Sequence, residues 1–537
     1  MLREIYCDKF YQKKVEFIDG FNVVLGTDSG DNSIGKSTFM LIIDFVFGGT
    51  TYSSSTDIID NVGDHHILFK FEFDNRFFHF SRSIMDQNVV TICDENYAPN
   101  ETISLNDYRK WLSEKYHLNL FELTFREAVG RHIRVYRKKN YDEAFPLHSA
   151  PKEKSSAAMV SLLKLFNRYK TISVLTKQAK ESEEKLSAYN KAQKLSFISS
   201  INKTTFKKNE KEIQRLQTEI HNLEAGLEHN LLDVDSTASE EAIHIKKDLT
   251  RAKRMRTGIL SRISILDENA IYSFSSTTDE LSELSTFFPE CNIKKISDIE
   301  AFHRKISTIF KSEIKAEKEE LTEAQKEYDS IITQLTQKLS QLVHNPNLSK
   351  IILQKHANAI KAIEKMQKEN EAYLKHQELQ VAKNSDTERL RLAKNEQYGI
   401  VEKQINFEME RINQEIYVEK YNAPTIHFND STYLFRTPND TGTGIAYKGL
   451  VVFDLAILKL TAIPILVHDS VVLKQISDEA IENITQQYIN CGKQVVIALD
   501  KQQSYSEKTA ETLEKYAILK LAPNGEELFG RSWGKKS

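Results

Sequence analysis

The amino-acid sequence predicts an α/β protein assembled from an N-terminal and a C-terminal lobe, with a long antiparallel α-helical coiled-coil insertion between them. Short apolar runs alternate with turns near both ends of the 537-residue chain. Glycine and proline are rare in the middle, where apolar residues recur at coiled-coil spacing. These observations divide the chain into residues 1–155, 156–420 and 421–537.

The N-terminal lobe contains a phosphate-loop motif between a predicted strand and a predicted helix. Phe21–Leu25 reads as a buried strand, and Phe39–Phe47 reads as an apolar helix. The chain between them matches the template G-x-x-x-x-G-K-[ST] at every fixed position. The residues expected to contact a nucleotide are Gly30, Asn32, Gly35, Lys36, Ser37 and Thr38. In such a loop, backbone N–H groups converge on phosphate oxygens and the lysine reaches the β- and γ-phosphates. The serine hydroxyl binds Mg²⁺, so Ser37 is a predicted metal ligand.

The middle of the chain predicts long helices. No proline occurs between Pro151 and Pro289, and three glycines (Gly226, Gly258 and Gly399) interrupt the stretch from about 152 to 420. Both residue types disfavour helix, so their scarcity favours it.

Two apolar seams follow coiled-coil spacing in this middle part. Apolar residues recur three and four apart over 213–227, and seven apart over 314–342. An irregular piece near 266–300 separates the seams, which predicts an antiparallel hairpin with its apex there. The proline in 344–348 should kink or interrupt the returning helix. A compact helical bundle would satisfy the same pattern.

The C-terminal lobe supplies a candidate partner for the phosphate loop. A phosphate loop needs a carboxylate for Mg²⁺, normally at the end of a neighbouring apolar strand. Asp469 ends the apolar run 464–469, and 495–499 predicts a second buried strand. Asp469 is therefore the second predicted Mg²⁺ ligand.

This arrangement resembles the SMC-like branch of the ABC ATPases, which includes RecN and the zinc-hook repair ATPases. The turn formed by Thr441, Gly442, Thr443 and Gly444 lies where that family carries its signature motif. Its sequence is similar to the Thr-Gly-Thr-Gly variant of a bacterial subfamily of uncharacterised SMC-like ATPases, many encoded in defence operons. The segment 298–304 is similar to that subfamily as well.

The resemblance implies an ABC-type ATPase head that uses ATP and Mg²⁺. It implies that residues 441–444 cover ATP held by a second copy, so that a homodimer forms through ATP-engaged heads. It further implies binding of double-stranded DNA, and an accessory subunit and an effector such as a nuclease in antiviral defence or DNA repair. Two alternatives stay open: an ATP-locked scaffold that neither hydrolyses ATP nor binds DNA, and a small-molecule phosphate-loop kinase with a helical insertion.

Three positions depart from the family pattern. Ser470 stands where the family places a catalytic glutamate, and a serine without a partner is a poor general base at neutral pH. Hydrolysis is then slow, or another residue positions the water; the nearest candidates are His468, Asp478 and Glu479. Asp500 follows the strand at 495–499 where a histidine is common, and the lone Cys291 predicts no zinc hook.

Basic residues gather where the first lobe meets the helical insertion. They are Arg131, Arg134, Arg137, Lys138 and Lys139, and they are predicted to contact DNA phosphates without reading sequence. A solvated surface with acidic neighbours is the alternative. A second group, between residues 246 and 262, is typical of the outer face of a coiled coil.

Composition limits the remaining possibilities. The formal net charge is −3, so any nucleic-acid site must be a local patch. The four cysteines are scattered, which indicates a reducing compartment. No signal peptide and no apolar run long enough to span a membrane is recognised, so a cytoplasmic protein without a membrane partner is expected.

Overall fold

The computed structural model describes residues 1–230, 236–271, 293–342, 346–417, 421–440 and 442–532. These residues form two compact units, one combining 1–187 with 379–537 and the other comprising 188–378. In the described part of the chain, strands occur in the first unit and the second is helical. This mixed α/β content with long helices agrees with the predicted class at that level.

A parallel sheet lies at the centre of the first unit. Its strands are β3 (Phe21–Leu25), β8 (Ile133–Arg134), β11 (Ile465–His468), β12 (Gln494–Leu499) and β13 (Ala517–Lys520). Their order in the sheet is β13-β3-β12-β11-β8, and every pairing is parallel. Strands β3, β11 and β12 are buried along their length, as continuous apolar strands covered on both faces should be. The sheet therefore joins segments from both ends of the chain.

An antiparallel sheet and a hairpin complete the strands described in this unit. The sheet has the order β2-β1-β4-β5-β6-β7. Its strands are β1 (Leu2–Tyr6), β2 (Lys14–Glu16), β4 (His66–Phe73), β5 (Arg76–Ser83), β6 (Val89–Cys93) and β7 (Pro99–Ser104). The hairpin pairs β9 (Thr425–Phe428) with β10 (Tyr433–Arg436). Strands β4 and β5 pair over their whole length, as the alternating aromatic pattern of this segment favours.

Shorter helices connect the strands of the first unit. In the N-terminal part they are α1 (Lys36–Val46), α2 (Thr56–Val62), α3 (Leu105–Lys115), α4 (Phe125–Val129), the 3-10 helix η1 (Tyr136–Lys138) and α5 (Ser155–Leu165). In the C-terminal part they are α12 (Thr443–Leu460), α13 (Ser470–Leu473), α14 (Asp478–Asn490), η2 (Gln502–Ser504) and α15 (Glu507–Lys515).

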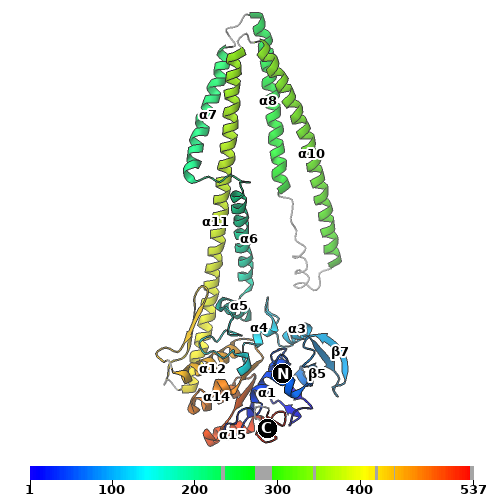
Figure 1. Ribbon diagram of the computed structural model, residues 1–537, viewed down its shortest axis with the longest axis vertical. Helices are drawn as coiled ribbons and strands as arrows, with labels where there is room; N and C mark the ends of the chain where they lie inside the picture. Colours follow the sequence, from blue (N-terminus) through cyan, green and yellow to red (C-terminus); the bar gives the residue numbers. More distant parts are fainter. Residues whose placement is uncertain (231–235, 272–292, 343–345, 418–420, 441, 533–537) are drawn as a thin grey trace. The chain divides into compact units, whose positions relative to one another are not determined.

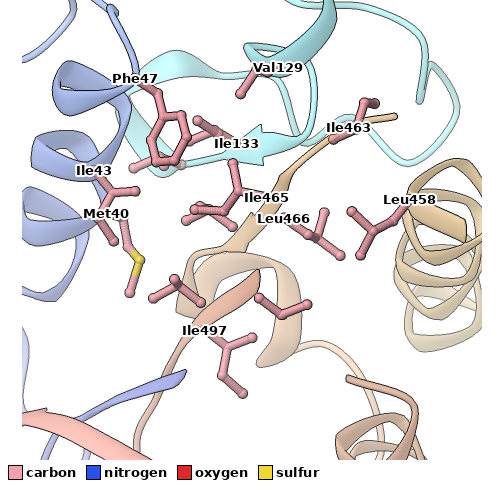
Figure 2. Close-up of a cluster of buried hydrophobic side chains, with 14 of the residues drawn as sticks. Met40, Ile43, Phe47, Val129, Ile133, Leu458, Ile463, Ile465, Leu466 and Ile497 are labelled. Atoms are coloured by element: carbon pink, nitrogen blue, oxygen red, sulfur yellow. The ribbon is translucent and has the colours of Figure 1, made fainter. Parts of the chain in front are cut away.

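Buried side chains from both ends of the chain pack around β11 (Figure 2). Leu466 faces Leu458 of α12, whereas Ile465 lies on the side of Met40 and Ile43 of α1. Because neighbouring residues of a strand point to opposite faces, β11 packs α1 on one face and α12 on the other. This core holds the phosphate-loop helix and the helix after the Thr-Gly-Thr-Gly turn against one strand.

Long helices make up the second unit and continue into the first. They are α6 (Lys170–Lys194), α7 (Lys203–Asn230), α8 (Ser236–Ile271), α10 (Ile293–Leu342) and α11 (Pro346–Tyr417). Helix α10 is described up to Leu342 and α11 from Pro346 onward, so the break predicted at 344–348 falls partly outside the described residues. Residues 343–345 lie outside the described residues, as does most of the predicted apex, including Cys291.

The two predicted seams pair with different partners within the chain. Leu216 of α7 packs against Ala359 and Ile363 of α11. Helix α10 packs along α8, with an ion pair between Arg256 and Asp329 at 2.6 Å and another between Arg262 and Glu317 at 3.0 Å. Figure 1 shows α7 beside α11 and α8 beside α10.

Both helix pairs are antiparallel, because residue numbers fall on one helix as they rise on its partner. These pairings have the order that the predicted antiparallel hairpin requires, because the outer helices α7 and α11 pair with each other and the inner helices α8 and α10 pair with each other. The two seams themselves do not meet, since each packs on a helix that the seam pattern did not identify. A heptad pattern reports that a helix has an apolar face but not which other helix covers it.

Candidate nucleotide-binding site

The phosphate loop has the backbone shape that an anion requires. It follows β3 and leads into α1, which confirms the predicted strand, loop and helix. Gly30, Ser33 and Gly35 have positive φ angles of 70°, 62° and 104°. Such left-handed residues turn successive N–H groups toward one point, and the N-terminus of α1 adds its positive dipole end. Gly35 also has no room for a side chain, because a Cβ there would lie 2.4 Å from the Cβ of Leu528.

Lys36 is buried in an ion pair with Asp500, a residue that was not predicted as part of the site. Its Nζ lies 2.5 Å from Asp500 Oδ1 and donates a hydrogen bond of 2.8 Å to the carbonyl of Asp31. The Lys36 and Asp500 side chains are 6% and 2% exposed. Lys474 contacts the other carboxylate oxygen of Asp500 at 2.9 Å. Two ammonium groups thus converge on one carboxylate beside the phosphate loop.

Gly26 explains how this carboxylate fits so close to the loop. A Cβ at Gly26 would lie 2.0 Å from Asp500 Oδ1 and 2.9 Å from Lys36 Nζ. The missing side chain therefore makes the space that the ion pair occupies. The sequence signal for Asp500 was its position directly after the apolar strand 495–499, the kind of position that led to Asp469.

The sheet brings three chain segments to one edge. Strands β3, β12 and β11 are neighbours and parallel, so their carboxyl ends meet at the same edge. The phosphate loop follows β3, Asp500 follows β12, and Asp469 follows β11. This is the edge at which open α/β sheets bind ligands.

Asp469 is fully buried and anchors the turn after β11. Its Oδ1 accepts a hydrogen bond of 2.8 Å from the Ser470 N–H, and its Oδ2 accepts one of 3.1 Å from the Tyr136 N–H. Oδ1 also accepts a hydrogen bond of 3.4 Å from the Ser470 hydroxyl, whereas Oδ2 keeps a second lone pair that can accept a ligand. Ser37 is half-buried in the first turn of α1. Hydroxyl and carboxylate oxygens suit Mg²⁺, so Ser37 and Asp469 would hold this ion.

His468 is the last residue of β11, but its side chain is bonded to α12 and α14, and its prediction as a catalytic residue is wrong. Its ring is fully buried: Nδ1 lies 2.6 Å from the Tyr488 hydroxyl, and Nε2 lies 2.9 Å from Asp454 Oδ2. Alternate residues of a strand point to opposite sides, and a local pattern cannot tell which side holds the substrate. Of the other candidates, Ser470 bonds Asp469, and Asp478 and Glu479 are exposed in the first turn of α14.

Buried polar groups join β8, β11 and α12 around Asp454. Arg134 donates two hydrogen bonds to the Asp454 carboxylate, and His132 Nδ1 lies 3.0 Å from its Oδ1. Although burial raises the pKa of Asp454, Arg134 and the two histidines hold this pKa well below its ordinary value. Burial lowers the pKa of His132 and of His468.

The Thr-Gly-Thr-Gly turn leads into α12. Thr441 lies outside the described residues, Gly442 caps the helix, and Thr443 and Gly444 form its first turn. A Cβ at Gly444 would lie 2.8 Å from the carbonyl oxygen of Gln475. The start of α12 thus packs closely on the backbone just beyond α13.

The predicted DNA-binding cluster is wrong for three of its five residues. Arg131 pairs with Glu153 at 2.7 Å, Arg134 with Asp454, and Lys138 with Asp44 at 2.8 Å; all three side chains are largely buried. Burial lowers the pKa of Lys138 to about 8. Their partners lie far away in the sequence, so the cluster looked unpaired. Arg137 is partly exposed and bonded to Asp57, and Lys139 is exposed.

Comparison with known proteins gives a partial family match and two structural similarities. A protein-family model described as "Uncharacterised protein conserved in bacteria (DUF2326)" matches residues 410–533. No curated protein matches the chain. The Smc head domain with a coiled coil and joint from Pyrococcus yayanosii is similar at 12% identity and a TM-score of 0.42, covering 99% of this chain and 96% of that one.

The second structure is the Smc head domain with an extended coiled coil from Pyrococcus furiosus, bound to the C-terminal domain of ScpA. It is similar at 10% identity and a TM-score of 0.35, covering 95% of this chain and 91% of that one. Both similarities are distant, so the function of this chain is inferred from the residues of its site.

Proposed function

We propose that this chain is an SMC-like, ABC-type ATPase that binds and hydrolyses ATP with Mg²⁺. The observation that carries the proposal is the buried pair of Lys36 and Asp500 beside the phosphate loop. A lysine held in place at a helix N-terminus, next to a loop whose N–H groups converge, is suited to bind the phosphates of a nucleotide. Asp469 lies at the same sheet edge and supplies a carboxylate for the metal.

The proposal includes head-to-head dimerisation, with residues 442–444 of one copy covering the ATP of the other. A turn that ends in the free N–H groups of a helix start is suited to meet a phosphate from outside its own subunit. An accessory subunit and an effector such as a nuclease, in cytoplasmic antiviral defence or DNA repair, complete the proposal.

Solution mass with and without ATP and Mg²⁺ tests the engaged-head mechanism. We expect the mass to rise about twofold with nucleotide, and Lys36→Ala to remove this rise because the variant lacks the phosphate-binding amine. Lys9→Ala, which removes an exposed lysine of the same unit, is the control and should behave as the parent protein. A mass that nucleotide leaves unchanged would mean that the arms, a partner or DNA set the assembly.

The proposal includes binding of double-stranded DNA, but not through the buried residues Arg131 and Arg134. Helix α8 carries Lys247, Arg251, Lys253 and Arg254, all exposed, and these can contact phosphates. Affinity for a DNA duplex should fall steeply between 50 and 200 mM salt, as phosphate contacts require.

Ser470 favours a second candidate function, that of a scaffold in which bound ATP holds the dimer together and is not hydrolysed. Its hydroxyl lies 3.4 Å from Asp469 Oδ1 and offers no base for the attacking water. Comparing hydrolysis with and without DNA separates the candidates, because turnover that DNA stimulates rejects the scaffold.

Among the described residues, no helix combines the length and apolar character that crossing a membrane requires.

A further inference from the structure

Asp500 lies directly beside the lysine of the phosphate loop. It follows β12, the strand that lies between β3, which leads to the phosphate loop, and β11, which Asp469 follows. Its carboxylate is 2% exposed and touches the phosphate-loop lysine at 2.5 Å. A side chain that contacts Lys36 would lie close to a phosphate group bound by Lys36.

The residues that the sequence suggested as general base are not placed close to Lys36 with a side chain free to bind the attacking water. The Ser470 hydroxyl and N–H both point to Asp469, and the ring of His468 is engaged by Asp454 and Tyr488. Asp478 and Glu479 are exposed at the start of α14. Asp500 combines burial, a carboxylate and direct contact with Lys36.

We propose that Asp500 is the general base of ATP hydrolysis, in place of the carboxylate that Ser470 lacks. This inference rests on the proposed ATPase function. The phosphates of bound ATP take the Lys36 amine, which frees Asp500 Oδ1 to accept a hydrogen bond from a water molecule. The water oxygen then forms a bond to the γ-phosphorus while its proton passes to Asp500. The bond between the γ-phosphorus and the bridging oxygen breaks, and its electron pair stays on the β-phosphate of ADP. Asp500 afterwards returns the proton to phosphate or solvent.

Lys474 keeps this carboxylate in place during the exchange. It holds Asp500 Oδ2 at 2.9 Å while Oδ1 faces Lys36, so one oxygen stays anchored when the other is released. Lys36 and Asp500 each keep a partner of opposite charge in this exchange, because ATP becomes the partner of Lys36 and Lys474 remains the partner of Asp500. Nucleotide binding therefore has to break an existing ion pair, and a neutral residue at 500 removes that cost.

Asp500→Asn tests the assignment with two independent measurements on the full-length chain. The first is the Kd for a fluorescent ATP analogue, and the second is phosphate release at saturating ATP and Mg²⁺. We expect a Kd equal to or tighter than that of the parent protein, with hydrolysis reduced at least about a hundredfold, the usual effect of losing a general base. Asp74→Asn, in an exposed turn where a positive φ suits asparagine, is the matched control and should leave both values unchanged.

Hydrolysis by Asp500→Asn within threefold of the parent rate overturns the assignment. A parent protein that binds ATP but does not release phosphate overturns it as well and supports the scaffold. A parent protein that binds no nucleotide refutes the proposed function itself.

If Asp500→Asn does not fold, Asp500→Glu keeps the charge and moves the carboxylate by one methylene. The expected result is then a loss of at least about tenfold in hydrolysis with Kd within threefold. An unchanged rate for this variant contradicts the proposal.

Discussion

Asp454 determines where the protons lie in the buried network of the first unit. Its depressed pKa keeps it a carboxylate, which can only accept hydrogen bonds. His468 must therefore carry its proton on Nε2, and its bare Nδ1 accepts from the Tyr488 hydroxyl. A neutral His468 thus bridges a charge on α12 and a phenol on α14. The same constraint places a proton on Nδ1 of His132.

Acid should destabilise the first unit through these two histidines. Burial lowers the folded-state pKa of each below the ordinary value of 6.5. The unfolded chain therefore binds more protons below about pH 6.5, so stability is fully present above that pH and falls as the pH drops toward the folded-state values. The slope is at most about 1.4 kcal/mol per pH unit for each proton. Asp454 adds a separate loss at lower pH, because its own pKa is depressed.

Thermal melts of the parent protein and His468→Gln between pH 5 and 8 check this expectation. Glutamine can donate to Asp454 and accept from Tyr488 but does not titrate, so the variant should show a shallower pH dependence. Equal slopes in the two proteins would contradict the assignment of His468 as a buried neutral group.

At the scale of elements, close backbone contacts link the parts of the site. Gly26 admits Asp500 beside the phosphate loop, Gly35 admits Leu528, and Gly444 admits the carbonyl of Gln475. The last contact joins the start of α12 to the segment after α13, which is the segment that follows Asp469. Because protein interiors are close-packed, a shift of the start of α12 must also move the segment after α13.

Gly444→Ala should uncouple the Thr-Gly-Thr-Gly turn from the rest of the site. The new methyl group would overlap the Gln475 carbonyl, which should cost about 1–3 kcal/mol in the free energy of unfolding. Solution mass should no longer rise with ATP, while the monomer still binds nucleotide through the phosphate loop. Melting curves, mass and nucleotide affinity measure these effects.

Gly399→Ala is the control for this variant. Gly399 lies within α11, and nothing lies within 4 Å of the added methyl group, so alanine should stabilise the helix by about 0.5–1 kcal/mol. A Gly444→Ala protein that melts and dimerises as its parent does would show that this contact is unimportant.

At the scale of the whole molecule, the helical unit is built from two antiparallel pairs. Asn209 of α7 bonds Glu369 of α11 at 3.0 Å, and Leu216 packs with Ala359 and Ile363 farther along the same pair. The α8–α10 pair is joined through Arg256 and Arg262. The described contacts between α7 and α11 are thus a polar pair and one small apolar cluster.

Leu216→Ala should weaken the α7–α11 pair and leave the nucleotide site intact. Leu216 is 9% exposed, so its loss should cost about 2–3 kcal/mol locally. Limited proteolysis should then cut α7 faster than in the parent protein, with ATP affinity unchanged. Leu374→Ala, at a position 56% exposed on α11, is the matched control and should change neither. Equal cleavage of the two variants would contradict the pairing.

Local sequence was enough to locate the phosphate loop, its flanking strand and helix, the carboxylate that follows β11 and the long helices. These features depend on short-range rules: glycine where φ is positive, continuous apolar runs in buried strands, and heptad spacing in paired helices. Contacts between residues far apart in the chain could not be predicted from local sequence. The partners of Arg131, Arg134 and Lys138, the pairing of the two seams and the approach of Asp500 to Lys36 all join distant segments of the chain. A side chain's charge can be read from its letter, but whether it meets water, a buried carboxylate or a phosphate depends on how the strands are ordered in the sheet.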